Sequence, residues 1–366
     1  MEKIFDLHVH YSFDLSIKET VDIFQAEFAQ TQTEKFCFLS LPHHADGEIV
    51  HFDPLQNIKG LFLKHVFCPN GYAFAGLSHP DDHADKQVVA EQFLKQIQTY
   101  FHSGYDGVKM LEGYPSLIKA WALPLDDVVY DAFYQFAQEK QFPILMHIAN
   151  PTENWDAASA PPEAIAAGRV YDESYPTKQE ITAQMFRVLE KFPRLKLILA
   201  HFGFMSDDLQ QAQQFMTYPN TLFDITPGGE QLIYMQKEWN RWLPFWEKYQ
   251  DRILYGTDTY AFPKDENWEI AFQRRPKFLW QFLQTKEFNT YLGVGFCGIG
   301  LEKSPRNKIY RENFVKLMGE PKGIDYTYMV EEIKRLLQTN LYSSIYAESD
   351  LQYMLEVLTK NNPMRL

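Results

Sequence analysis

Eight short apolar runs alternate with helical patterns along the chain, and this alternation limits the fold more than any other feature of the sequence. Most of the runs are continuously apolar, which is typical of strands buried on both faces of a parallel sheet. Eight such strands alternating with helices predict an α/β fold, a (β/α)8 TIM barrel with extra C-terminal helices. The runs span residues 4–10, 36–41, 72–79, 106–111, 142–149, 195–201, 221–226 and 252–258.

Two stretches depart from a minimal barrel. Residues 150–176 are too long for a plain turn and predict a lid or wall of an active site. Residues 262–366 follow the last apolar run and read as mostly helical, with 306–318 as the helix that closes the barrel. The predicted division is therefore a barrel over 1–320 and a helical appendage over 321–366, packed on the barrel or at a dimer interface.

Charge and cysteine content exclude several classes of protein. The net charge of −13 over 366 residues leaves no basic surface for nucleic acid. No apolar run reaches the roughly 18 residues of a membrane helix, and the first ten residues, MEKIFDLHVH, show no leader pattern. The three cysteines (Cys37, Cys68 and Cys297) lie far apart, which favours a reducing compartment. We expect a cytoplasmic protein that acts on a small molecule.

Histidines and an aspartate gather where the predicted strands end, which is where barrel enzymes place their active sites. His8 and His10 lie two residues apart on the first run, so their side chains share one face. The fifth, sixth and eighth runs end in or near His147, His201 and Asp258. A single buried histidine is more often structural, but this coincidence predicts a divalent metal site with one or two ions. Imidazole-rich ligation favours zinc, with manganese or iron as alternatives.

Such a metal ion would supply an activated water. Bound to neutral imidazoles and one carboxylate, it keeps a positive charge and lowers the pKa of its water toward about 7. The Asp258 carboxylate beside that water would act as the base. His201 would move the proton or stabilise an oxyanion. Asp258 and His201 are therefore the predicted catalytic residues.

Four ordered segments resemble the amidohydrolase superfamily of metal-dependent barrel enzymes: DLHVH, MHIANP, LILAHFG and YGTD. The longer phrases RVLEKFPRLKLILAHFG and KIYRENFVKLMG resemble its amidohydrolase-related branch (amidohydrolase 2), which includes aminocarboxymuconate-semialdehyde decarboxylase. The resemblance covers about residues 4–320. It implies that His8, His10, His147 and Asp258 bind metal. It also implies that His201 orients or deprotonates water in a one-metal site, or binds metal in a two-metal site.

Lys109, at the end of the fourth run, has three interpretations. In two-metal members of the superfamily a lysine at this place is carboxylated and bridges the ions, and the context here resembles dihydroorotase-like enzymes. The decarboxylase pattern has no lysine there. Lys109 would otherwise bind a substrate carboxylate or pair with Glu112 in a structural role.

Several other residues near strand ends are candidates for substrate binding, although ordinary loop packing explains each of them as well. Arg274 and Arg275 lie beyond the eighth run and would clamp a carboxylate, or form a surface ion pair, the more ordinary outcome. The predicted substrate-binding residues are His79, Glu112, Tyr114, Asn150 and Trp155.

The leading hypothesis is a metal-dependent hydrolase that cleaves an amide, ester or lactone-type C–N or C–O bond. The alternative is a metal-dependent, non-oxidative decarboxylase or hydratase of a small carboxylic acid on the same scaffold. Lys109 favours hydrolysis. A third hypothesis, a barrel that binds a ligand without catalysis, would leave the predicted metal ligands without a role.

Apolar residues recur at helical spacing after residue 320 and must be covered by the barrel or by a second subunit. Because closed two-fold dimers are the commonest soluble assembly, we expect a homodimer. The apolar residues are Tyr328, Met329, Ile333, Leu336, Leu337, Leu351, Met354, Leu355 and Leu358.

Overall fold

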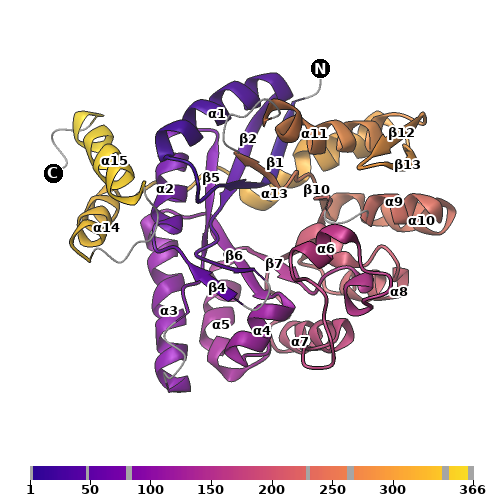
Figure 1. Ribbon diagram of the computed structural model, residues 1–366, viewed down its shortest axis with the longest axis horizontal. Coiled ribbons are helices and arrows are strands. Elements are labelled where there is room, and N and C mark those ends of the chain that lie inside the picture. Colours follow the sequence, from indigo (N-terminus) through magenta and orange to yellow (C-terminus); the bar gives the residue numbers. More distant parts are fainter. Residues whose placement is uncertain are drawn as a thin grey trace.

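A parallel sheet forms the centre of the computed structural model (Figure 1). It has nine strands, in the order β10-β9-β8-β7-β6-β5-β2-β1-β11. The structure describes residues 3–46, 49–79, 85–227, 231–261, 268–339 and 346–361. The strands are β1 (Ile4–Tyr11), β2 (Thr33–Leu39), β5 (Gly71–Gly76), β6 (Gly107–Gly113), β7 (Ile144–Ile148), β8 (Leu197–Leu199), β9 (Thr221–Asp224), β10 (Ile253–Leu254) and β11 (Thr259–Ala261).

Strands β10 and β11 are two halves of one barrel strand, and together they close the sheet. β10 pairs with β9, and β11 pairs with β1. The link between them also bonds to β1, because Leu7 N donates to Tyr255 O at 3.0 Å and Asp258 N donates to His8 O at 2.8 Å. The predicted TIM barrel is therefore confirmed. Regular pairing breaks where the chain reaches Asp258, whose φ of 54° is left-handed.

Helices surround the sheet, and the signals in the sequence set their ends. Thr177 and Glu180 form the expected capping box at the start of α7, and α3 ends at Gly104, whose φ is 100°. The helices up to residue 284 are α1 (Ile17–Thr31), α2 (Gln56–Val66), α3 (Lys86–Ser103), α4 (Pro115–Trp121), α5 (Asp131–Lys140), α6 (Pro162–Ala166), α7 (Lys178–Lys191), α8 (Leu209–Phe215), α9 (Gln231–Lys237), α10 (Trp239–Tyr249) and α11 (Trp268–Gln284).

Two hairpins were not predicted. One joins β3 (His43–Asp46) to β4 (Ile49–Phe52), and the other joins β12 (Phe288–Tyr291) to β13 (Val294–Cys297). The second lies in the stretch that we expected to be mostly helical. Its two-residue turn is formed by Leu292 and Gly293, whose φ angles are both positive, 49° and 81°.

Apolar side chains fill the barrel interior except at the end where the predicted site residues lie. Phe314 of α13 (Asn313–Met318) belongs to this interior cluster. Together with α12 (Lys303–Asn307) and a π-helical turn (Lys308–Glu312), α13 forms the expected closing segment. Strand residues of the cluster include Phe5, Leu7, Leu39, Tyr72, Phe74, Leu145, Ile198, Leu222 and Leu254.

The C-terminal helices pack on the barrel's own helices. α14 (Tyr326–Thr339) contacts α2 and α3, and α15 (Ala347–Asn361) contacts α1 (Figure 1). The chain itself therefore covers much of the apolar stripes, and the argument for a homodimer that we drew from them is removed. A homodimer stays a prediction. The buried members are Met329, Ile333, Leu336, Leu351, Met354 and Leu358. Across the described part of the chain, no helix has the length and apolar character that a membrane span needs.

Asp350 ties α15 to the barrel through a buried ion pair. Its Oδ2 lies 2.7 Å from Lys59 Nζ on α2, and its Oδ1 accepts a hydrogen bond from Ile17 N at 2.9 Å. The side chains of Asp350 and Lys59 are 3% and 2% exposed, so removal of one charge leaves the other buried without a partner.

We predict that Asp350→Ala lowers the free energy of unfolding by about 3 kcal/mol, because breaking a buried pair leaves an uncompensated charge. Urea denaturation measures the change. Asp22→Ala is the control, because Asp22 and Lys18 form a pair that is mostly solvent-exposed. This control should change stability by less than about 0.5 kcal/mol. Equal effects of the two substitutions would contradict the structural role of the Asp350 pair.

Candidate metal centre

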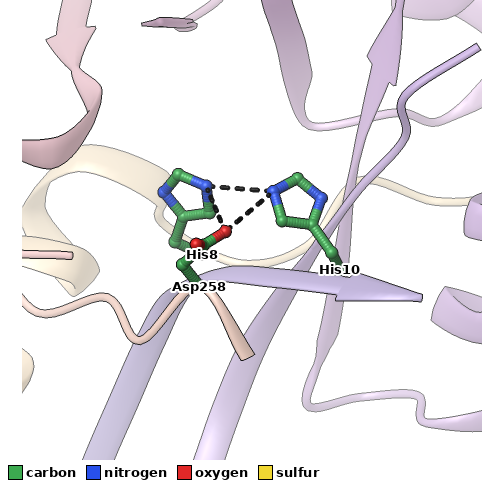
Figure 2. Close-up of side chains that lie close together, drawn as sticks. All are labelled: His8, His10 and Asp258. Atoms are coloured by element: carbon green, nitrogen blue, oxygen red, sulfur yellow. Dashed lines mark hydrogen bonds and ion pairs between the residues drawn. The ribbon is translucent and has the colours of Figure 1, made fainter. Parts of the chain in front are cut away.

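His8, His10 and Asp258 converge at one end of the barrel and can hold a metal ion. One ligand atom from each of the three lies within 4.8 Å of the others (Figure 2). The Nε2 atoms of His8 and His10 are 3.1 Å apart. Asp258 Oδ1 lies 3.6 Å from His8 Nε2 and 3.4 Å from His10 Nε2.

Hydrogen bonds on the far side of each ring fix the tautomers. His10 Nδ1 lies 3.0 Å from the carbonyl oxygen of Leu39, which only accepts, so Nδ1 carries the proton. His8 Nδ1 donates in the same way to Asp224 Oδ2 at 2.7 Å. Burial lowers the pKa of His8 well below its usual value and the pKa of His10 to about 4, which keeps both rings neutral. Each Nε2 therefore presents a lone pair.

Two lone pairs and a carboxylate oxygen that face one another repel unless a cation lies between them. The predicted ligands His147 and His201 lie next to the space between these three side chains. The ring centroid of His201 is 5.2 Å from that of His8 and 5.1 Å from that of His147. Among the described residues, the buried atoms His147 Nε2 and His201 Nδ1 have no hydrogen-bond partner. Imidazole nitrogen with one carboxylate oxygen is a donor set that fits zinc, manganese or iron.

Asp224 supports the centre, and our sequence reasoning missed it. Its carboxylate accepts from His8 Nδ1 and, through Oδ1, from His201 N at 2.7 Å, so one buried side chain orients two of the histidines. Thr226 also donates to Asp224. Asp224 ends β9, so the rule that found the other site residues, applied to the seventh strand, would have found it.

Asp6 was missed as well. Its carboxylate accepts from His8 N at 2.9 Å and from Thr257 Oγ1 at 2.6 Å, which ties β1 to the segment that carries Asp258. Burial raises the pKa of Asp6 to about 7. Polar contacts therefore fix the backbone on both sides of the centre.

Arg275 of α11 pairs with Asp258, which corrects the interpretation of this arginine as a surface residue. Arg275 Nη1 lies 2.6 Å from Asp258 Oδ2 and also donates to the Asp258 carbonyl oxygen. Burial alone would raise the pKa of Asp258. Opposing charge, that of the Arg275 guanidinium first, outweighs burial and lowers it. Asp258 is thus held as a carboxylate.

Lys109 of β6 is a buried cation, 2% exposed. Burial lowers its pKa to about 8, although Asp224, Asp258 and Glu112 act in the opposite direction. Within the residues that the structure describes, Lys109 Nζ makes no hydrogen bond or ion pair. Glu112, its predicted structural partner, instead lies 3.0 Å from His79 Nε2.

A cavity of about 350 Å³ opens beside the centre. Of the predicted substrate-binding residues, Tyr114 and Asn150 line it. The other three lie elsewhere. His79 stacks on Trp121 at 3.4 Å between ring centroids, Trp155 donates to the carbonyl oxygen of Pro176, and Glu112 borders a separate space of about 10 Å³. Lining residues with polar or aromatic side chains include His10, Lys109, Tyr114, His147, Asn150, Arg169, His201, Asp258, Tyr260, Arg274, Arg275 and Tyr291.

Comparison with known proteins gives a family and a fold. A family model described as an amidohydrolase matches residues 67–313. Among curated proteins no relative matches. Solved structures similar to this chain include an uncharacterised TIM-barrel protein from Bordetella bronchiseptica, at 13% identity over 86% of this chain and 98% of that one, with a TM-score of 0.54. The 4-oxalomesaconate hydratase LigJ from Rhodopseudomonas palustris is also 13% identical, over 92% and 98% of the two chains, with a TM-score of 0.50. At these identities the likeness establishes the fold alone.

We predict that Asp224→Asn weakens metal binding by about 10- to 100-fold, because a side chain that orients metal-bound histidines contributes that much to affinity. Competition with a chelator measures the affinity. His10→Ala should lose the bound ion, and His102→Ala, at an exposed site on α3, should bind it like the wild type. Full metal content in purified His10→Ala, measured by elemental analysis, would show that the site is wrongly assigned.

Proposed function

Because this chain belongs to the amidohydrolase family, we propose that it is a metal-dependent lyase that decarboxylates or hydrates a small carboxylic acid. The sequence alone favoured hydrolysis and kept this reaction as the alternative. The buried cation of Lys109 beside the metal centre now favours the lyase reaction over hydrolysis. Among the similar folds, one protein is a hydratase named for a carboxylate, 4-oxalomesaconate.

The burial of Lys109 beside the metal centre is the observation that carries the proposal. Its ammonium group is buried on the wall of the cavity, and no acid among the described residues forms an ion pair with it. Burial lowers the pKa of Lys109 to about 8, and Asp224, Asp258 and Glu112 oppose that shift. A buried cation that lacks a fixed partner is suited to a substrate carboxylate.

Both proposed reactions place negative charge on carbon. Decarboxylation breaks a C–C bond, releases carbon dioxide and leaves an electron pair that takes up a proton. Hydration adds the oxygen of water to one carbon of a double bond and a proton to its neighbour, which carries the charge in between. A fixed cation such as Lys109 stabilises such charge without reorganisation.

The metal ion would be held by His8, His10 and Asp258, with His147 and His201 beside it, and when bound it supplies a Lewis acid. Zinc is the proposed ion, with manganese or iron as alternatives. The chain's own part is to hold Asp258 as a carboxylate through Arg275 and to keep the ligand histidines in one tautomer through Leu39 and Asp224.

Hydrolysis is the second candidate. Its support is the pair of unpartnered nitrogens, His147 Nε2 and His201 Nδ1, on rings that burial keeps neutral by lowering their pKa values. Either could take a proton from water. The base that we expected, Asp258, is less suited, because its Oδ2 bonds Arg275.

We propose that the protein is located in the cytoplasm, because its three cysteines are free and free thiols are typical of a reducing compartment. The proposed partner is a small-molecule substrate.

A panel of substrates tests the reaction class. Metal-loaded protein is incubated with unsaturated and aromatic carboxylic acids, and with amides, esters and lactones. Released carbon dioxide and loss of double-bond absorbance report lyase chemistry, and released acid or amine reports hydrolysis. Turnover confined to the amides, esters and lactones would contradict the lyase proposal and favour the second candidate.

We predict that Lys109→Met lowers turnover by at least about 100-fold, since loss of one preorganised charge has that effect on catalysis. Its metal content should equal that of the wild type by elemental analysis. Lys196→Met, outside the cavity, is the charge-matched control. A variant that loses one of two ions, with turnover partly restored by acetate, would show instead that Lys109 is a carboxylated bridge.

A further inference from the structure

Two guanidinium groups line the cavity. Arg169 comes from the predicted lid over 150–176, and Arg274 comes from α11. Both side chains are exposed, unlike Lys109. Within the described part of the chain, neither has a hydrogen-bonded or ion-paired side-chain partner. Segments distant in sequence thus bring two cations to the border of one cavity.

The lid that carries Arg169 is folded and anchored. Arg169 N donates to Ala164 O at 2.8 Å, and Arg169 O accepts from Asn154 Nδ2 at 2.8 Å. Asn154 is itself 3% exposed. Asn150, which follows β7, donates to Tyr171 Oη at 2.6 Å. The backbone of Arg169 is therefore held in place before a ligand arrives, which reduces the entropy lost on binding.

The position of Arg274 is fixed through its neighbour. Arg275 donates to both the carboxylate and the carbonyl oxygen of Asp258, and this ties that turn of α11 to the metal centre. The two adjacent arginines therefore divide their roles: Arg275 holds a metal ligand, and Arg274 borders the cavity.

Among the described residues that line the cavity, cations outnumber acids by one after the Asp258–Arg275 pair is set aside. The whole chain carries a net charge of −13. At the cavity, Arg275 is neutralised by Asp258, and the other lining cations are Lys109, Arg169 and Arg274. The acids that also line the cavity are Glu153 and Glu163. Glu153 lies in the field of Lys178. A positive cavity in an acidic protein draws anions.

We propose that the substrate carries two carboxylates, one beside Lys109 at the metal centre and the other held at the border of the cavity by Arg169 and Arg274. The place of the first carboxylate rests on the proposed function. Guanidinium groups bind carboxylates through paired, charge-assisted hydrogen bonds, which suits them to the second. The cavity volume of about 350 Å³ limits the ligand to a short chain or a single ring.

Equilibrium binding tests this inference without turnover. Calorimetry on metal-loaded protein compares succinate, glutarate, adipate and pimelate with butyrate, pentanoate, hexanoate and heptanoate. We expect at least one diacid to bind about tenfold tighter than its matched monoacid, which is the size of one charge-assisted hydrogen bond. Arg169→Met and Arg274→Met should each remove most of this difference and leave the affinity for the monoacid unchanged.

Arg187→Met is the matched control, because Arg187 pairs with Asp126 on the outside of the barrel. It should bind the diacids like the wild type. Equal affinities for diacids and monoacids, no binding of either series, or an equal loss of both series in the two arginine variants would overturn the inference. A protein that prefers diacids but shows no lyase activity would retain the inference and contradict the proposed function. Lyase turnover of a monoacid by a protein that shows no preference for diacids would retain the proposed function and contradict the inference.

Discussion

The close approach of two imidazole lone pairs is the constraint on which the rest of the site depends. His8 Nε2 and His10 Nε2 lie 3.1 Å apart, and both are acceptors because the opposite nitrogens donate to Asp224 and to the Leu39 carbonyl oxygen. Without a cation this arrangement is repulsive, and with one it becomes a chelate. The fold therefore holds the ligands of a metal ion in place before the ion binds.

The barrel supplies the force that holds them there. β1 is paired on both sides, with β2 and with β11, and the broken eighth strand bonds to it through the backbone of Asp258. Asp6 adds a second tie by bonding both His8 N and Thr257. The break in the eighth strand has a function: it lets Asp258 leave the regular ladder, with a left-handed φ, and turn toward the two histidines.

The sequence predicted the barrel well because strands buried on both faces leave continuous apolar runs, and helices between them leave caps such as Thr177 and Gly104. It led us to expect His8, His10, His147, His201 and Asp258 at one end of the barrel, because a site residue that ends a strand can be found by its position in the sequence, and the structure does bring these five side chains together there. It did not predict Arg275 on Asp258, since that contact joins a helix to a strand end through space alone. It did not predict the β12–β13 hairpin either, because the turn places Leu292 at a positive φ, where the usual sequence signal is Asn, Asp or Gly.

The candidates for substrate binding show where counting along the chain stops being useful. Tyr114 and Asn150 follow their strands directly and line the cavity. His79 lies three residues beyond β5, where the chain has already turned, and its ring stacks on Trp121 instead. The number of residues between a strand and a side chain indicates how far along the barrel axis that side chain lies. The direction that a loop takes depends on side-chain packing, which leaves no periodic pattern in the sequence.

Anomalous diffraction from crystals loaded with zinc or manganese tests the central claim most directly. The account predicts a peak at about 2.0–2.2 Å from His8 Nε2, His10 Nε2 and one oxygen of Asp258, the distances usual for imidazole and carboxylate ligands. A peak at any other place, or none with these three side chains in the arrangement of Figure 2, would contradict it.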